Sequence, residues 1–300
     1  MKTELVVISG KGGTGKTSVA ASLAVLAGPV VLADCDVDAA DLHLLMSPEV
    51  RITHEFMSGN EAVIDQARCI RCGICASWCA FDAIRTVADP ENGQRLVVDR
   101  LACEGCGVCA HYCPAKAIDF PERWRGRWFE SETRCGPMVH ACLDVGAGNS
   151  GKLVTQVRRR ASEIAVARGL QWVITDGPPG VGCPVIASLT GATHVLAVTE
   201  PGVSGRHDLK RLLQLTRHFS IPSFVCVNRY DLDESAMEEI GSITREHGAT
   251  LLGGIPWDPG FSEMQHAGKT VVEGSGPGAL RIREIWEKLR TLVMDMKDTE

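Results

Sequence analysis

The segment "GKGGTGKT", Gly10 to Thr17, decides the fold. It satisfies the pattern G-x-x-x-x-G-K-[ST], follows the apolar run Leu5–Ile8 and precedes the helical pattern Thr17–Leu26. A glycine-rich turn between a strand and a helix cradles phosphate groups, because its backbone N–H groups turn inward and the helix adds the positive end of its dipole. We expect Lys16 to reach the β- and γ-phosphates of ATP and the Thr17 hydroxyl to ligate Mg²⁺. The loop residues expected to contact the nucleotide and its metal are Gly12, Gly13, Thr14, Gly15, Lys16 and Thr17.

Outward from this loop, short apolar runs alternate with helical patterns along most of the chain. The runs have apolar residues at consecutive positions, which is expected when both faces of a parallel sheet are covered. Alternation of strand and helix predicts an α/β fold, a doubly wound and mostly parallel sheet of the P-loop NTPase type. The expected strands are Leu5–Ile8, Val30–Ala33, Trp172–Thr175, His194–Val198 and Phe224–Val227. The expected helices are Thr17–Leu26, Lys152–Arg168 and Asp208–Phe219.

This alternation stops between about Glu61 and Glu122, where eight of the thirteen cysteines occur. The interval contains an internal repeat, in which four cysteines recur with the same spacing further along the chain. We therefore predict that residues 61–122 form an inserted domain, and that residues 1–60 and 123–300 form its host. The repeated positions are Cys69, Cys72, Cys75 and Cys79, followed by Cys103, Cys106, Cys109 and Cys113.

Each half of the repeat has the spacing C-x₂-C-x₂-C-x₃-C, which is typical of bacterial-type ferredoxins with two [4Fe–4S] clusters. In such pairs the fourth cysteine of each half binds the other cluster. The pattern predicts a small α+β ferredoxin domain with two ligand sets. The first set is Cys69, Cys72, Cys75 and Cys113, and the second is Cys79, Cys103, Cys106 and Cys109. Zinc is the alternative ligand for C-x₂-C pairs, and the doubled four-cysteine array without an accompanying histidine disfavours it.

The composition narrows the function classes. The net charge is −6, and the one tight basic run, Arg158–Arg160, is expected to be a solvated helix face, which argues against a nucleic-acid partner. No apolar run approaches the roughly 20 residues that span a bilayer. Thirteen cysteines without an export signal indicate a reducing compartment, so we expect a cytoplasmic protein whose cysteines bind metal.

Lys11, the additional lysine at the start of the loop, gives the chain a family resemblance. The sequence resembles the deviant-Walker ATPases, the superfamily that includes MinD, ParA, the Mrp-type cluster carriers and the iron protein of nitrogenase. The resemblance implies that Lys11 crosses a dimer interface to touch the partner's nucleotide, and therefore that ATP binding drives homodimer formation. It extends over nearly the full chain, and the combination resembles the MinD-superfamily ATPases that carry an inserted ferredoxin domain.

Four further motifs carry the same resemblance. In "VVLADCDVDAADLHLL" it implies that Asp36 positions the attacking water, whereas Asp34 and Asp38 either share that role or cap the following helix. In "WVITDGPPG", Asp176 lies at a strand end and matches the carboxylate that holds Mg²⁺ through water. By resemblance, Asn228 in "FVCVNR" reads the adenine. The loop "GIPWD", with Pro256 and Asp258, closes over the same base.

Three functions are compatible with these motifs. The first is a dimeric ATPase that couples ATP binding and hydrolysis to electron transfer through two clusters, with Lys11, Lys16 and Asp36 as catalytic residues and weak hydrolysis without its partner. Its expected client is a metal–sulfur-cluster protein of the nitrogenase-cofactor-binding type, or another redox protein. The second is an iron–sulfur or metal-cluster assembly carrier. The third is a MinD- or ParA-like positioning ATPase, which requires membrane or DNA binding.

Two features outside these motifs leave alternatives open. Cys183 lies seven residues after Asp176, where the nitrogenase iron protein has a cluster ligand, so Cys183 with Cys135 or Cys142 could form a dimer-bridging cluster or could simply pack. The terminal helix has one apolar stripe, and its polar face mixes acids with bases, so we expect it to dock on the sheet rather than on a membrane.

Overall fold

The computed structural model describes residues 2–90, 93–144 and 150–297. The chain divides into two compact units. The first comprises Met1–His54, Arg127–Leu143 and Ser150–Glu300, and the second comprises Glu55–Gly126 and Asp144–Asn149. The expected insert, residues 61–122, lies inside the second unit. Each unit is described by itself below.

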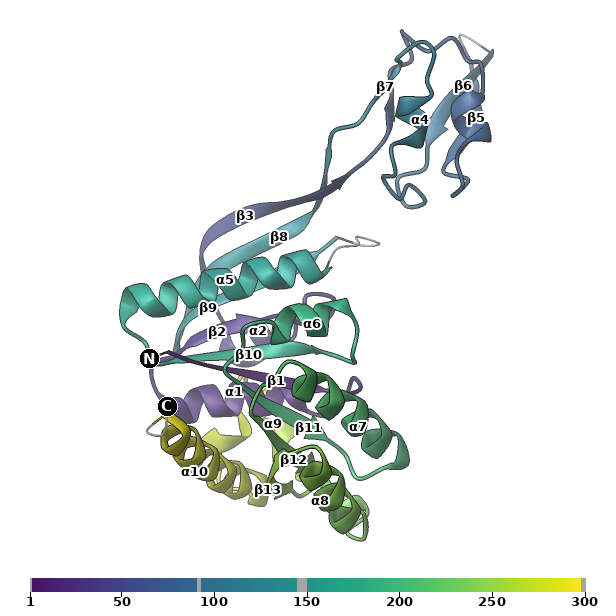
Figure 1. The fold of residues 1–300 in the computed structure, drawn as a ribbon. Coiled ribbons are helices and arrows are strands. Elements are labelled where there is room, and N and C mark those ends of the chain that lie inside the picture. The colour runs from purple at the N-terminus through teal and green to yellow at the C-terminus, as the bar shows by residue number, and fades with distance from the viewer. Residues whose placement is uncertain (1, 91–92, 145–149, 298–300) are drawn as a thin grey trace. The chain divides into compact units, whose positions relative to one another are not determined.

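The first unit is built on a nine-stranded sheet with the order β13-β12-β11-β1-β10-β2-β9-β8-β3 (Figure 1). Strand β1, which leads into the phosphate loop, is central and pairs in parallel with β10 and β11. Strands β2, β9, β12 and β13 extend the parallel part on either side. The predicted α/β fold with a large, mostly parallel sheet is therefore confirmed. The strands are β1 (Thr3–Ser9), β2 (Val31–Asp34), β3 (Glu49–Asn60), β8 (Glu122–Thr133), β9 (Gly136–Leu143), β10 (Trp172–Pro179), β11 (His194–Thr199), β12 (Ser223–Asn228) and β13 (Thr250–Ile255).

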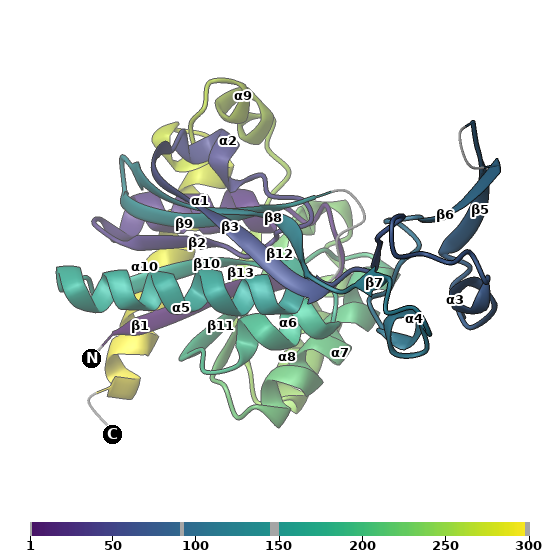
Figure 2. The same ribbon diagram turned by 90° about the horizontal axis from the view of Figure 1, so that it is seen from above.

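Helices cover both faces of this sheet, which explains the consecutive apolar residues of β1 (Figures 1 and 2). Leu5 and Val7 belong to the core under α1 and α10, whereas Val6 and Ile8 belong to the core under α6, α7 and α8. All four side chains are fully buried, and each contributes about 1.5–3 kcal/mol. The helices are α1 (Lys16–Ala27), α2 (Leu42–Met46), α5 (Ser150–Arg168), α6 (Cys183–Leu189), α7 (Val203–His218), α8 (Ala236–Glu246), α9 (Gly260–His266) and α10 (Pro277–Lys297), with short 3₁₀ turns at Tyr230–Leu232 and Val271–Glu273.

The terminal helix α10 docks on the sheet as expected, because its stripe Ile282, Ile285, Trp286, Leu289 and Val293 is buried. Trp286 packs against Trp172 of β10, with ring centroids 5.1 Å apart. Within the described residues, no helix combines the length and the apolar character needed to cross a bilayer.

Three strands at one edge of the sheet, β9, β8 and β3, were not predicted. β3 and β8 each begin in one unit and end in the other. Within the first unit, His54 of β3 stacks on Trp128 of β8 with ring centroids 3.7 Å apart. Glu130 of β8 accepts a hydrogen bond from His54 at 3.1 Å and pairs with Arg160 of α5 at 2.9 Å.

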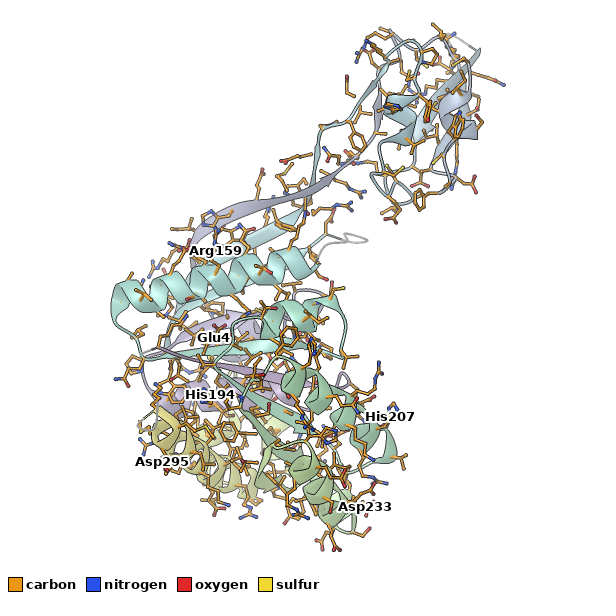
Figure 3. The ribbon with its side chains drawn as sticks, in the orientation of Figure 1. Glu4, Arg159, His194, His207, Asp233 and Asp295 are labelled. Carbon is orange, nitrogen blue, oxygen red and sulfur yellow. The ribbon has the colours of Figure 1, made fainter. Side chains whose placement is uncertain are left out.

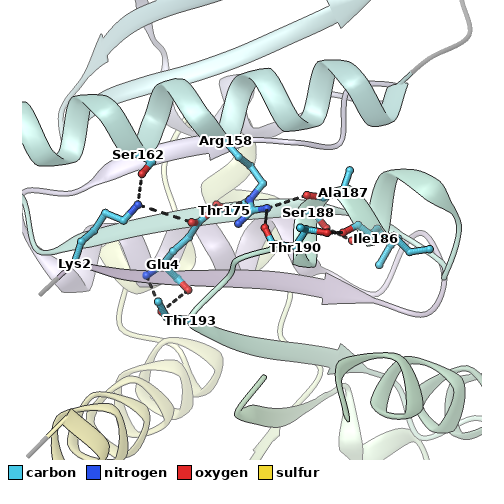
Figure 4. A network of polar contacts seen from close by, with 11 residues as sticks. Lys2, Glu4, Arg158, Ser162, Thr175, Ile186, Ala187, Ser188, Thr190 and Thr193 are labelled. Carbon is cyan, nitrogen blue, oxygen red and sulfur yellow. Dashed lines mark hydrogen bonds and ion pairs between the residues drawn. The ribbon is translucent and has the colours of Figure 1, made fainter. Parts of the chain in front are cut away.

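Arg158 corrects the expectation that the Arg158–Arg160 run is a solvated face. Its side chain is buried, and its Nε donates to Oε1 of the buried Glu4 at 2.7 Å (Figure 4). Its Nη1 also donates to the carbonyl oxygens of Ala187 and Thr190, at 2.8 and 2.7 Å, at the end of α6. Arg159, labelled in Figure 3, is the exposed member of the run. The buried guanidinium thus joins β1, α5 and α6.

The second unit shows the sequence repeat as a repeat of structure. β4 (Val63–Ile64) pairs with β7 (Ile118–Asp119), and β5 (Ile84–Asp89) pairs with β6 (Gly93–Val98). These pairs are equivalent under the repeat, because Ile64 opposes Ile118 and Val98 opposes Ile84. The short helices α3 (Ile74–Ser77) and α4 (Val108–His111) are equivalent too. Trp78 and Tyr112, at equivalent positions after them, stack with centroids 5.0 Å apart.

Candidate nucleotide site and cysteine cavities

The phosphate loop connects β1 to α1 and contains two left-handed glycines. Gly13 and Gly15 have φ values of 79° and 83°, a region that favours glycine. A Cβ on Gly15 would also lie 2.5 Å from Nδ2 of Asn228. That amide nitrogen donates to the carbonyl oxygen of Thr14 at 2.8 Å. The shape of the loop is therefore fixed by β12 as well as by its own glycines.

Lys16 begins α1 and points into a set of acids. Its Nζ lies 2.7 Å from Oδ1 of Asp176 and 3.3 Å from Oδ2 of Asp36. Burial by itself would lower the pKa of Lys16, but the charges of Asp176 and Asp36 outweigh it and raise this pKa. Parallel strands end at the same edge of a sheet, which explains why residues far apart in sequence meet here. Lys16 is thus held by its own chain in a position facing the loop.

Asp176 is fully buried within β10, three residues before its last residue Pro179, and its Oδ2 has no hydrogen-bond partner within the described residues. A buried carboxylate oxygen without a donor costs free energy unless a ligand supplies one. A water bound to Mg²⁺ would supply such a donor. Thr17 lines the cleft against the phosphate loop, whereas Asp176 lies behind Lys16 and does not line it. The donor set therefore fits a magnesium ion that accompanies a nucleotide, with Asp176 and Thr17 as the residues that would hold it.

The three acids after β2 have different positions. Asp34 is fully buried, and its carboxylate accepts backbone N–H groups of Asp36 at 3.2 Å and Leu42 at 3.3 Å, so it organises the turn before α2. Burial and the charge of Asp176 raise the pKa of Asp34 well above its usual value. Asp36 and Asp38 instead line the cleft. Burial raises the pKa of Asp36, the charge of Lys16 opposes this rise, and Asp176 adds to it.

The cleft has a volume of about 500 Å³ and lies against the phosphate loop. Among the lining residues that were not identified from the sequence are Arg229, which follows β12, and Gln265 of α9. Arg229 has a φ of 54°, a left-handed conformation that is uncommon outside glycine. The lining comprises Ser9, Gly12, Gly13, Thr14, Gly15, Lys16, Thr17, Ser18, Asp36, Asp38, Ala39, Asp41, Leu45, Pro178, Pro179, Pro184, Arg229 and Gln265.

Lys11 is in contact with its own chain. Its Nζ lies 2.9 Å from Oε2 of Glu200 and 3.5 Å from Oγ of Ser204. The other oxygen of Glu200, Oε1, lies 2.8 Å from Nη1 of Arg229. Sequence reasoning missed Glu200, because the turn that bears it carries no motif. The predicted role of Lys11 at a partner's nucleotide stays a prediction.

Two residues that were predicted to lie at the adenine base, Asn228 and Asp258, make hydrogen bonds to the backbone of this chain. Asn228 uses both amide atoms, since its Oδ1 also accepts the backbone N–H of Arg229 at 3.1 Å. Asp258 accepts the N–H groups of Gly260 and Gly278, both at 2.8 Å, at the starts of α9 and α10. Neither Pro256 nor Asp258 lines the cleft. Their predicted contacts with adenine stay predictions.

The eight repeated cysteines of the second unit line two separate cavities, four to each. Cys69, Cys72, Cys75 and Cys113 line one cavity, and Cys79, Cys103, Cys106 and Cys109 line the other. These are the two combinations that the sequence spacing predicts. Each set takes three cysteines from one half of the repeat and the fourth from the other half.

The backbone around each cavity follows the repeat. Equivalent positions have left-handed backbone: Arg71 and Gly105, Gly73 and Gly107, and Asp82 and Lys116. Equivalent N–H groups also point at sulfur, because Ala83 donates to Sγ of Cys79 and Ala117 donates to Sγ of Cys113, each at 3.3 Å. A Cβ on Gly105 would lie 2.3 Å from the carbonyl oxygen of Asn60, so this position needs glycine. Such N–H···S contacts are the kind that tune iron–sulfur clusters.

The spacing of the cysteine side chains bears on which metal group they could hold. Throughout residues 2–90, 93–144 and 150–297, no group of three or more His, Cys, Asp or Glu side chains is placed to hold one ion. A [4Fe–4S] cluster has a different requirement, since its four cysteines bind separate irons around a larger core. None of the eight cysteines forms a disulfide. Burial, opposed by backbone hydrogen bonds and reinforced by neighbouring cysteines, raises the pKa of Cys75 and Cys109. The four cysteines at each cavity are the donor set that a four-iron cluster requires, and zinc stays the alternative.

The remaining cysteines divide by exposure. Cys35, Cys135 and Cys226 are buried, and Cys135 packs in the core of the first unit. Cys183 is exposed at the start of α6, and Cys142 is exposed near the end of β9. Of the two candidates for sharing a bridging cluster with Cys183, only Cys142 thus remains at the surface.

Comparison with known proteins supplies a family. Residues 5–271 match the family described as the CobQ/CobB/MinD/ParA nucleotide binding domain. The uncharacterized protein MJ0578 of Methanocaldococcus jannaschii is 31% identical over 293 residues, which cover 97% of each chain. A second uncharacterized protein of that organism, MJ0579, is 26% identical over 39% of this chain and 42% of its own length.

Solved structures show the same fold at lower identity. The cell division ATPase MinD of Pyrococcus furiosus superimposes with a TM-score of 0.57 and 19% identity, covering 97% of this chain and all of its own. MinD of Pyrococcus horikoshii, solved with Mg-ADP, gives a TM-score of 0.58 and 18% identity over 98% of both chains. At these identities the likeness concerns the fold alone.

Proposed function

We propose that this chain, which belongs to the CobQ/CobB/MinD/ParA family of nucleotide-binding domains, is an ATP-dependent dimeric switch. The switch controls electron transfer through two [4Fe–4S] clusters to a client metal–sulfur-cluster protein. The observation that carries the proposal is the sorting of eight cysteines into two cavities in the combinations expected for a two-cluster ferredoxin. A nucleotide site and a redox relay would then share one chain.

The nucleotide part uses residues of the cleft. Lys16 binds the β- and γ-phosphates, Thr17 and Asp176 hold Mg²⁺, and Asp36 orients the water that attacks the γ-phosphate. Asp36 lies 3.3 Å from Nζ of Lys16, so the attacking water and the terminal phosphate would be held side by side. Lys11 completes the site of a second copy, and ATP therefore favours the dimer. The products are ADP and inorganic phosphate.

The cysteine-rich unit would hold the redox groups. Cys69, Cys72, Cys75 and Cys113 bind one cluster, and Cys79, Cys103, Cys106 and Cys109 bind the other. When bound, such clusters supply one-electron storage and transfer. The chain's own contribution is the N–H donors at Cys79 and Cys113 and the apolar surroundings, which set how readily an electron is held.

The test uses protein purified without oxygen. The clusters are reduced, and ATP, ADP or a non-hydrolysable ATP analogue is added to separate samples. We expect the cluster potential, or the rate of electron transfer to an added acceptor, to differ between the ATP and ADP samples, because a nucleotide shifts an equilibrium only by binding two states differently. Lys16→Ala is the matched control, since it removes the response without touching the cysteines. Identical potentials and rates in all samples would refute the coupling, and colourless or zinc-containing protein would refute the clusters.

A second candidate, cluster assembly on a client, is favoured by one observation. Cys72 and Cys106, one in each cavity, are exposed. An exposed ligand can be displaced by an incoming thiolate, as transfer to an acceptor requires. Incubation with an iron-free acceptor ferredoxin tests this candidate. Transfer of iron to the acceptor that depends on ATP supports assembly, and complete retention of iron supports electron transfer.

A further inference from the structure

Two cations share one carboxylate: Lys11 of the phosphate loop and Arg229, which lines the nucleotide cleft. The oxygens of Glu200 lie 2.9 Å from Nζ of Lys11 and 2.8 Å from Nη1 of Arg229. The side chain of Glu200 is 14% exposed, whereas those of Lys11 and Arg229 are 37% and 42% exposed. The carboxylate of Glu200 is therefore largely buried, whereas the side chains of both cations are partly exposed to solvent.

The backbone around Glu200 is held tightly by the first turns of α7. A Cβ on Gly205 would lie 2.3 Å from the carbonyl oxygen of Glu200, so the chain closes on itself there. Thr199 donates to the carbonyl oxygen of Gly205 at 3.1 Å across the same turn. The phosphate loop meets this helix as well, because a Cβ on Gly10 would lie 2.3 Å from Cβ of Asp208. One helix thus positions both the carboxylate and the loop that carries Lys11.

Charge determines what a nucleotide does to this contact. The carboxylate of Glu200 and its two cations carry a net charge of +1 among themselves. Phosphates of ATP in the cleft compete with Glu200 for Arg229, and those of a partner's ATP would compete with it for Lys11. Arg229 lines the cleft itself, so the incoming phosphates and Glu200 attract the same guanidinium. Partly exposed ion pairs are weak, and breaking one changes an equilibrium by a factor of about two to five. The contact is therefore strong enough to bias Lys11 and weak enough to be released.

We propose that Glu200 is a positioning residue that holds Lys11 against its own chain, and that it thereby sets the ATP concentration at which two copies associate. The proposal rests on the proposed role of Lys11 at the partner's nucleotide. Glu200 competes with that role, because an amine in contact with Glu200 is unavailable to a second copy. ATP that draws Lys11 and Arg229 away from Glu200 removes the competition.

The test compares Glu200→Gln with the wild type. The amide keeps the size of the side chain and removes its charge. We expect half-maximal dimerisation, measured by analytical ultracentrifugation against ATP concentration, at about two- to five-fold lower ATP. Glu239→Gln is the matched control, because Glu239 also pairs with an arginine, Arg206 at 2.9 Å, but this arginine, unlike Arg229, does not line the cleft. This control should leave the ATP requirement unchanged.

Lys11→Ala, alone and combined with Glu200→Gln, separates positioning from a merely structural role. In the Lys11→Ala background, Glu200→Gln should no longer lower the ATP requirement. An equal effect in both backgrounds, or weaker dimerisation of Glu200→Gln, would overturn the proposal.

A direct readout does not need dimers. The rate at which an amine-acylating reagent modifies Lys11, followed by mass spectrometry without nucleotide, should rise about two- to five-fold in Glu200→Gln. An unchanged rate would overturn the proposal. If ATP causes no dimerisation of the wild type while the acylation rate still rises, the proposed dimeric switch fails and Glu200 is still shown to hold Lys11.

Discussion

The nucleotide-binding unit and the cysteine-rich unit differ in the size of the core that supports each candidate site. The first buries large apolar clusters on both faces of its sheet and ties Lys16 to acids of its own chain. In the second, the buried cluster comprises five residues, Ala62, Cys75, Ile84, Leu96 and Ile118, and five more cysteines are packed against it and only partly buried. Small domains with little core need a metal or another cross-link to fold. The first site is thus preformed, whereas under the proposed function the second would depend on the clusters that it binds.

Removal of iron should have the largest effect on stability. If it has none, the two units do not differ in the way described above. We expect anaerobic treatment with a chelator to unfold the cysteine-rich unit, because binding of the clusters and folding are coupled there. Limited proteolysis should then cut between Glu55 and Gly126, while ATP binding by the other unit persists. Equal resistance to protease with and without iron would show that the small core suffices by itself.

Replacement of Arg158 should give the next largest effect. Arg158→Met leaves Glu4 buried without its partner and removes two donors from the end of α6, so we expect a loss of about 3–5 kcal/mol in the free energy of unfolding of the nucleotide-binding unit. The neighbouring exposed Arg159→Met should change it by less than about 0.5 kcal/mol. Urea denaturation of both variants measures the difference. Similar values for the two would mean that the internal ion pair does not hold this unit.

The burial of Arg158 could have been predicted from the sequence, but it was overlooked. Val154, Val157, Arg158 and Ala161 are buried on one face of α5, and their helical spacing already places Arg158 on the apolar stripe. Lys16, Asp36 and Asp176 were predictable, because each follows a strand pattern and parallel strands end at one edge. The pairing of Glu200 with Lys11 was not, since it depends on how a turn packs. The edge strands β3 and β8 were missed because their exposed faces carry polar and charged residues.

Acid should destabilise the nucleotide-binding unit through His140. Burial, together with the charge of His43, lowers the pKa of His140 from 6.5 to about 4. The unfolded chain therefore binds a proton between these values that the folded chain does not, and stability falls as the pH drops through this window. The loss is at most about 3 kcal/mol. His140→Phe keeps the stack on Phe129 and should flatten the dependence; identical slopes for variant and wild type would contradict this assignment.

Replacement of Asn228 should give the smallest loss of stability, and it tests whether Asn228 stabilises the phosphate loop. Asn228→Ala leaves the carbonyl oxygen of Thr14 without its donor, which costs about 1–2 kcal/mol. If Asn228 mainly braces the loop, affinity for ATP and for GTP should fall together in calorimetric titrations. A loss confined to ATP would instead support the predicted contact with adenine.

The position of β1 in the middle of the sheet has a consequence for synthesis on the ribosome. Both neighbours of β1, β10 and β11, are translated after the cysteine-rich segment, and β11 ends at Thr199. That segment, Glu55–Gly126, has therefore left the ribosome on the order of 4–15 s before the amino-terminal strand can be flanked on both sides, at elongation rates of roughly 5–20 residues per second. In the nascent chain, the segment Glu55–Gly126 can therefore fold before β1 has both of its neighbouring strands.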